Sequence, residues 1–289
     1  MRKLMIVDGM ALLFRSYFAT AAMGNFFPNR DGVPTNGVQG FLRHMMAAKQ
    51  TFQPTDLVVC WDMGAETFRN DLYDGYKAHR PAPAPELVPQ FDQARQASET
   101  LGFTNLGVHG LEADDLIASL VENYATDVPI TIVSGDKDLF QLLRPNVTIA
   151  LTKKGYTEYD VYTEDRFVEE YGFTPKQYVD YKALIGDAAD GYPGVKGIGP
   201  KTATRLIQSY GTIGGLIESL PNETKGVQKK VTEQREMLDI SYELAALHYE
   251  PQVTLDGGAP IPPWSETMKA QLEALDYSLV VRYGESLHA

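Results

Sequence analysis

The stretch Leu4-Met5-Ile6-Val7-Asp8-Gly9 joins a short apolar run to an aspartate and a glycine. Two further runs have the same form: Leu57 to Trp61 (LVVCW) before Asp62, and Ile130 to Val133 (ITIV) before Ser134-Gly135-Asp136. An apolar run that ends at turn residues indicates a buried parallel strand. Helix-spaced segments, such as 37–51 and 112–124, lie between the runs. This alternation predicts an α/β fold with a central, mostly parallel sheet and flanking helices.

The composition is that of an ordinary globular protein, because 44% of the 289 residues are hydrophobic and 22% are charged. It excludes a disordered chain, a collagen-like fibre and a disulfide-rich miniprotein. No apolar run reaches the ~18 residues that span a bilayer, and we expect no secretory signal from the residues at the start of the chain. We therefore expect a cytoplasmic protein without membrane contact. The single cysteine, Cys60, lies in a buried run and is expected in the core.

The net charge of −12 by itself argues against a polyanionic partner such as DNA. Much of that charge lies in tight clusters within or beside apolar runs, at Asp8, Asp62, Glu112, Asp114, Asp115, Asp136, Asp138, Asp187 and Asp190. Parallel strands present their carboxyl ends at one edge of a sheet, where ligands bind, so the strand-end aspartates are expected to lie together. Acids that hold divalent cations no longer repel a polyanion.

Carboxylate oxygens without clustered His or Cys suit Mg²⁺ or Mn²⁺ rather than zinc. Nine acids suit two ions, which together can activate a water and stabilise a leaving oxygen in phosphodiester hydrolysis. Ordinary structural roles stay open for the same residues. Acids at 112–115 suit the first turn of a helix, Asp136 or Asp138 could cap one, and 187–190 could form a turn.

Residues 71–89 break the alternation of strands and helices, with four prolines and no strand pattern, before a helix expected over 86–101. In and beside this excursion lie positive and aromatic side chains: Arg69, Tyr73, Tyr76, Lys77 and Arg80. Stacking surfaces beside basic groups are typical of proteins that hold single-stranded nucleic acid. The alternative is a solvated loop whose aromatic rings pack inward.

A glycine-rich turn, GVKGIGPKTA at 194–203, joins two expected helices. Glycines let backbone amides approach an anion, and Pro200 suits the first turn of the following helix. With Lys196, Lys201 and Thr202 beside it, the turn predicts a clamp on a nucleic-acid phosphate that resembles a helix-hairpin-helix. A simple glycine-rich turn is the alternative. The tail beyond residue 251 is expected to be a linker and a terminal helix over 265–283.

Five motifs, in order, resemble the 5′–3′ exonuclease and flap endonuclease superfamily: IVDGMALLFRSYFA, WDMGAETFRNDLYDGYKAHRP, GLEADDLIASL, SGDKDLFQLL and GDAADGYPGVKGIGPKTA. The likeness is strongest to the 5′-nuclease domain of bacterial DNA polymerase I and covers about residues 1–250. It implies a nuclease core over 1–173 with a helical arch at about 71–101. A helical DNA-binding subdomain over 174–250 and a linker with a C-terminal helix over 251–289 would follow.

The resemblance also implies roles for single residues. The first metal site is matched by Asp8, Asp62, Glu112 and Asp114, with Asp115 beside it. The second is matched by Asp136, Asp138, Asp187 and Asp190. Catalytic residues that steady the scissile phosphate are matched by Lys77 and Arg80, and an aromatic that stacks on a base by Tyr76. The hairpin whose carbonyls hold K⁺ beside the DNA is matched by Gly197, Ile198 and Gly199.

These features predict a structure-specific 5′-nuclease that uses two Mg²⁺, or Mn²⁺ in their place, on DNA with a free 5′ end, flap or junction. Primer removal in replication and repair are the expected tasks, and a monomer is the expected state. Two alternatives are a junction-binding protein that has lost its chemistry and a compact metal-dependent RNase. The first would lack an acid or an arch base, and the second would be shorter and lack the glycine hairpin.

Overall fold

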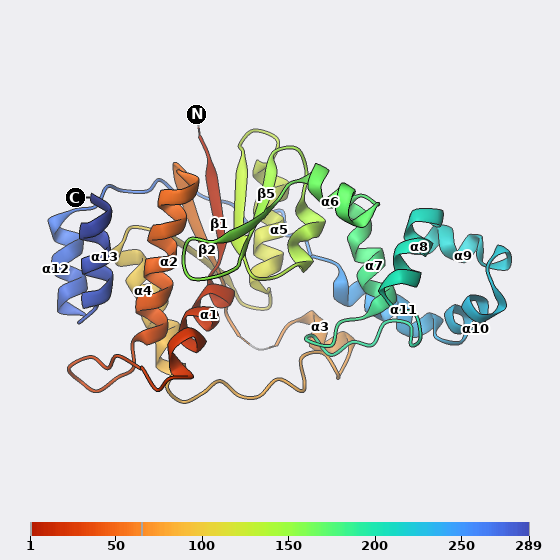
Figure 1. Ribbon diagram of the computed structural model, residues 1–289, viewed down its shortest axis with the longest axis horizontal. Coiled ribbons are helices and arrows are strands. Elements are labelled where there is room, and N and C mark those ends of the chain that lie inside the picture. The colour runs from red at the N-terminus through yellow and green to blue at the C-terminus, as the bar shows by residue number, and fades with distance from the viewer. Residues whose placement is uncertain (1, 65, 289) are drawn as a thin grey trace.

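The central sheet has six strands in the order β3-β2-β1-β4-β5-β6 in the computed structural model, which describes residues 2–64 and 66–288 (Figure 1). The strands are β1 (Leu4–Asp8), β2 (Asp56–Asp62), β3 (Thr104–Val108), β4 (Ile130–Ser134), β5 (Val147–Thr152) and β6 (Tyr159–Tyr162). All neighbours pair in parallel except β5 and β6. The expected mostly parallel sheet is confirmed, and the three apolar runs are its adjacent strands β2, β1 and β4.

Alternation along the strands supplies one core on each face of the sheet. Met5, Val7 and Trp61 face α1 (Gly9–Ala21), α2 (Asn36–Phe52) and α4 (Val88–Thr100). The last two helices, α12 (Glu266–Ala274) and α13 (Ser278–His288), pack on α4 and α2 from outside. On the opposite face, Ile6 and Ile132 pack against α5 (Ala113–Tyr124).

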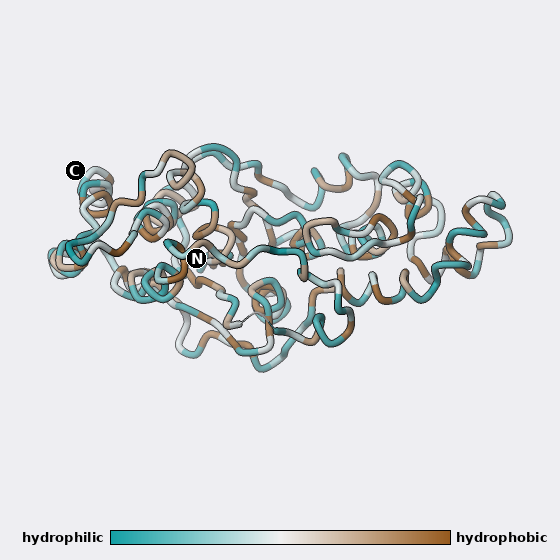
Figure 2. The backbone as a smooth tube through the Cα atoms, turned by 90° about the horizontal axis from the view of Figure 1, so that it is seen from below, coloured by the Kyte–Doolittle hydropathy of each residue, from teal (hydrophilic) through white to brown (hydrophobic). Residues whose placement is uncertain are grey.

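The core on the α5 side continues into a helical lobe. The lobe follows α6 (Glu164–Tyr171) and contains α7 (Tyr178–Ile185), α8 (Pro200–Tyr210), α9 (Ile213–Glu218), α10 (Lys225–Glu233) and α11 (Arg235–Ala245). Helix α11 packs along α7. Figure 2 shows that the lobe forms one end of an elongated molecule and that the C-terminal helices form the other. None of the described helices is long and apolar enough to cross a bilayer.

The expected helical arch at 71–101 needs correction. A short helix, α3 (Phe68–Leu72), is followed by turns and extended chain over 73–87, which runs along the lower side of Figure 1. Prolines at 81, 83 and 85 lack the N–H that a helix needs. The helix expected over 86–101 forms as α4, but it belongs to the body of the protein. Buried Gln90 fixes it to α2, since its side chain accepts from the Val38 N–H at 3.1 Å and donates to Asn36 at 2.9 Å.

The single terminal helix expected over 265–283 is also wrong, because two helices form there. Asp276 lies between them with a φ of 62°, in the left-handed region that interrupts a right-handed helix. Its carboxylate accepts two bonds of 2.8 Å from the Arg30 guanidinium. The break is therefore fixed by a contact with a distant part of the chain.

An aromatic cluster supports the short turn that carries Asp138. Phe140 is fully buried, and its ring lies 4.5 Å from Tyr162, 5.6 Å from Phe167 and 5.7 Å from Tyr178 between ring centres. Replacing it leaves a cavity that rigid neighbours cannot fill. We predict that Phe140→Ala lowers the free energy of unfolding by about 3–5 kcal/mol, measured by urea denaturation.

Phe18 provides the matched control, because its side chain is 59% exposed. Phe18→Ala should change the free energy of unfolding by no more than about 0.5 kcal/mol. A Phe140→Ala protein as stable as the Phe18→Ala protein would contradict the proposed importance of the cluster.

Candidate active site

Acids converge where β1, β2 and β4 end. Asp8 ends β1 and caps α1, where its Oδ1 accepts from the Ala11 N–H at 2.9 Å. Its Oδ2 accepts from the Ser134 hydroxyl at the end of β4 at 2.7 Å. Asp62 ends β2 and accepts from the Ala113 N–H at 2.6 Å, which attaches the start of α5 to the same edge. Hydrogen bonds between neighbouring elements thus fix the expected convergence.

The carboxylates at this edge repel one another. Burial, aided by the charges of Asp62 and Asp136, raises the pKa of Asp8 to about 7. Burial and then the charges of Asp136, Asp8 and Asp62 raise the pKa of Asp114 well above its usual range. Without a bound cation, such a group holds protons near neutral pH.

A second group of acids lines an open cleft of about 560 Å³. Its carboxylates are those of Asp136, Asp138, Asp187 and Asp190. Burial and the charge of Asp136 raise the pKa of Asp138 to about 7, although Lys182 opposes this. The Lys182 ammonium, only 7% exposed as a residue, lies 2.6 Å from Asp138 Oδ1 and also binds Asp187. Lys182 is not among the residues predicted from the sequence, although a lysine within an apolar helix, five residues before Asp187, was the available signal.

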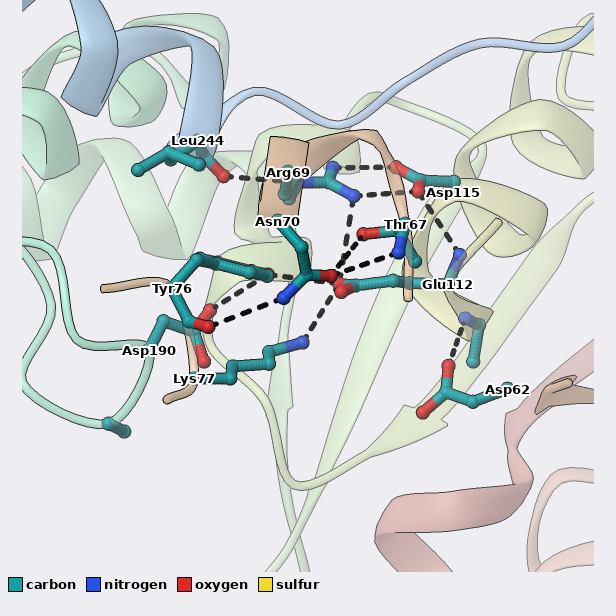
Figure 3. Close-up of polar contacts among 12 residues, drawn as sticks. Asp62, Thr67, Arg69, Asn70, Tyr76, Lys77, Glu112, Asp115, Asp190 and Leu244 are labelled. Atoms are coloured by element: carbon teal, nitrogen blue, oxygen red, sulfur yellow. Dashed lines mark hydrogen bonds and ion pairs between the residues drawn. The ribbon is translucent and has the colours of Figure 1, made fainter. Parts of the chain in front are cut away.

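Of the two predicted arch residues, Lys77 connects the two acid groups (Figure 3), whereas Arg80 binds the second group only. The Lys77 ammonium donates to Glu112 Oε2 at 2.9 Å, and its backbone N–H donates to the Asp190 carbonyl at 2.7 Å. Arg80 lies 2.6 Å from Asp190 Oδ1. Burial opposes the charged form of Lys77, but Glu112 and Asp190 outweigh it and raise its pKa. Lys77 therefore keeps its positive charge beside both acid groups.

The prediction that Tyr73 and Tyr76 are both open stacking surfaces needs correction. Tyr76 is 3% exposed and packs with Val179, Tyr192 and Leu244 of the helical lobe, with Tyr73 partly buried beside it. The Tyr76 hydroxyl lies 3.1 Å from Glu112 Oε2. Burial and the charge of Glu112 raise its pKa, so it stays a phenol that donates to Glu112. The inward-packed alternative describes these rings better.

Arg69 and Asp115 are also placed differently from the expectation. Arg69 is 2% exposed and Asp115 is fully buried, and they form two bonds of 2.8 Å with each other. Arg69 therefore has no open face for DNA. Both carboxylate oxygens of Asp115 accept from the Arg69 guanidinium, as Figure 3 shows. We correct the metal-ligand prediction for Asp115 and the DNA-contact prediction for Arg69. A sequence cannot distinguish a buried charge pair from two surface charges.

The glycine-rich turn is exposed in the helical lobe. Lys196, Gly197, Gly199 and Lys201 are exposed and Thr202 is half-buried, whereas Ile198 anchors the turn in the core. Gly197 has a φ of 89°, which favours glycine. The Lys230 ammonium donates to the Gly197 carbonyl at 2.7 Å. The Gly197 carbonyl therefore already binds a positive group, the ammonium of Lys230.

The donor chemistry of the acids fits a hard divalent cation, because it consists of crowded carboxylate oxygens that repel one another. Within 2–64 and 66–288, no three His, Cys, Asp or Glu side chains stand in a ready-made metal-binding arrangement. Protons and the side chains of Lys77, Arg80 and Lys182 compensate the acids instead. A bound divalent cation would supply the same compensation.

The chain is similar to known proteins over most of its length. Residues 3–172 match the family model "5'-3' exonuclease, N-terminal resolvase-like domain", and residues 173–259 match "5'-3' exonuclease, C-terminal SAM fold". The chain is 54% identical over 246 residues to a 5'-3' exonuclease of Bacillus subtilis, covering 85% of this chain and 83% of the relative. It is 37% identical to DNA polymerase I of Bacillus caldotenax, covering 88% of this chain but 29% of the polymerase.

A solved structure of the bacteriophage T5 flap endonuclease with DNA and metal ions has the same fold. Its TM-score is 0.69 at 22% identity, covering 99% of this chain and 97% of the phage protein. Two adjoining family models match residues 3–259, and the Bacillus subtilis relative is similar over most of the length of both chains. The chain therefore belongs to the 5′–3′ exonuclease family.

Proposed function

We propose that the protein is a structure-specific 5′-nuclease that hydrolyses DNA phosphodiesters at 5′ ends, flaps and junctions. One observation carries the proposal: mutually repelling carboxylates gather at the sheet edge directly beside the cations Lys77 and Arg80. Such a site needs positive charge, and an open cleft lined by Arg80 and the second group of acids lies there. Family membership supports the same activity.

Two divalent ions, Mg²⁺ or Mn²⁺, would activate water and neutralise the phosphate when bound. In this proposal Asp8, Asp62, Glu112 and Asp114 would hold the first ion. Asp136, Asp138, Asp187 and Asp190 would hold the second. Lys77 and Arg80 would orient the scissile phosphate and neutralise charge that builds on it, as fixed groups that need no reorganisation.

The helical lobe would hold the duplex part of the substrate through backbone contacts without reading its sequence. Lys196, Lys201 and Thr202 would contact phosphates. The carbonyls of the hairpin at 197–199 would hold K⁺. The Lys230 ammonium, which donates to the Gly197 carbonyl, would move away to let K⁺ bind. We propose a division into a core over 1–173, a DNA-binding subdomain over 174–250 and a C-terminal segment over 251–289. We propose that the protein acts as a monomer in the cytoplasm and that its tasks are primer removal and repair.

Removing a carboxylate from the second group tests the proposal. Asp138→Ala and Asp190→Ala should each abolish Mg²⁺-dependent cleavage of a labelled 5′-flap duplex, whereas affinity for the duplex should stay measurable. Asp127→Ala is the control, because Asp127 is exposed and lies outside the cleft. Full activity in either test variant would refute the assignment.

Lys77 should act on the chemical step. We predict that Lys77→Ala reduces the single-turnover rate by about 100-fold or more, since a fixed charge near the phosphate is lost. Its effect on duplex affinity in a chelating buffer should be much smaller. An unchanged single-turnover rate would exclude the role.

Raised carboxyl pKa values make metal binding depend on pH. Asp8 and Asp138 have pKa values of about 7, so protons compete with metal below that pH. Affinity for Mn²⁺, measured by calorimetry, should rise between pH 6 and pH 8, with proton release detected by comparing buffers. An affinity for Mn²⁺ that does not change with pH would contradict the raised pKa values of these carboxyl groups.

The same shifts set the sign for metal-free stability. The folded state binds more protons than the unfolded state between about pH 4 and pH 7, so the free energy of unfolding should fall as the pH rises through this window.

A further inference from the structure

Helix α11 is fastened at both ends to parts of the protein with different proposed tasks. At its start, Gln234 accepts from the Lys196 N–H at 2.8 Å and donates to the Lys196 carbonyl at 3.3 Å. These two bonds attach the helix to the glycine-rich turn. The contact uses the backbone of the turn and leaves the Lys196 side chain exposed.

The other end of α11 is held by Arg69. Its Nε donates to the Leu244 carbonyl at 3.3 Å (Figure 3), and its Nη2 donates to the Ala246 carbonyl at 2.8 Å. The last carbonyls of a helix lack partners within the helix and carry partial negative charge, so a guanidinium suits them. Arg69 thus caps the C-terminus of α11.

The same guanidinium holds the start of α5. It forms two 2.8 Å bonds with Asp115 and lies 3.6 Å from Glu112 Oε2. Asp115 in turn accepts from the backbone N–H of Glu112 at 3.3 Å and from that of His248, beyond α11, at 2.8 Å. One buried pair therefore joins the end of α11 to the turn that carries Glu112 and Asp114.

We propose that α11 is a spacer that sets which phosphodiester is cut, with Gln234 and Arg69 as its positioning residues. This inference rests on the proposed function, in which the duplex is held at the glycine-rich turn and cut at the acids. An α-helix is stiff, and the 11 residues of α11 span about 16 Å at 1.5 Å per residue. Its packing against α7, which carries Lys182, holds the spacer to a second element of the site.

Arginine is required because its planar group binds a carboxylate with two parallel bonds while its other donors reach the two carbonyls. A lysine keeps the charge but cannot make these four contacts together. Loosening either end of α11 should leave binding and chemistry in place and let the cut move to neighbouring phosphodiesters.

The test is product mapping at nucleotide resolution on an end-labelled 5′-flap duplex with Mg²⁺, for wild type, Arg69→Lys and Gln234→Ala. We expect both variants to spread cleavage over adjacent positions. The rate at the principal position should fall about tenfold or more, since small misplacements are costly, whereas affinity in a chelating buffer should stay within about twofold. Asp115→Asn, which keeps the side-chain shape, replaces Arg69→Lys if that protein fails to fold by circular dichroism.

Matched controls lie in the same lobe. Arg205→Lys alters an arginine with two bonds to Glu223, and Gln228→Ala alters a glutamine bound to the Pro221 and Glu223 carbonyls, without touching α11 or the acids. Both controls should cut at the wild-type position. Folded Gln234→Ala and Arg69→Lys proteins that keep the wild-type pattern would overturn the inference, as would controls that spread the cuts equally. A wild-type protein that cuts no flap would instead overturn the proposed function.

Discussion

Mutual repulsion among carboxylates at the end of a parallel sheet is the constraint on which the structure depends. The sheet places Asp8 and Asp62 on adjacent strands, and α5 adds Asp114. Burial makes the repulsion strong, and it is offset by protons on the acids and by three cationic side chains, those of Lys77, Arg80 and Lys182. Each of these cations comes from an element outside the parallel sheet. The segments that carry them therefore lie beside the acids at the carboxyl ends of its strands.

That requirement explains why the helical lobe and the segment over 73–87 lie against the core. Lys182 comes from α7, and Lys77 and Arg80 come from a proline-rich segment that cannot form a helix. Apolar packing makes these contacts rigid, because the core on the α5 side runs without interruption into the lobe. The buried pair of Arg69 and Asp115 then joins α3, α5 and α11 at one point.

Features with a local signal could be predicted from sequence, whereas features decided by tertiary contacts could not. Apolar runs identified β1, β2 and β4, but β3 (TNLGV) and β6 (YDVY) are half-exposed edge strands without such a run. The acids were found through their clustering. Lys182 was missed, and Arg69 and Asp115 were assigned to DNA and metal, because burial and partner choice depend on residues far along the chain. The motif resemblance identified the family that the comparisons confirm.

Anomalous diffraction from crystals soaked in Mn²⁺ would locate the divalent ions on the protein. We predict a manganese peak coordinated by carboxylate oxygens of Asp8, Asp62 and Asp114, and a second one beside Asp138 and Asp187 with the Lys182 ammonium displaced. Fully occupied manganese elsewhere on the protein, with these carboxylates still paired to the side chains of the chain, would contradict it.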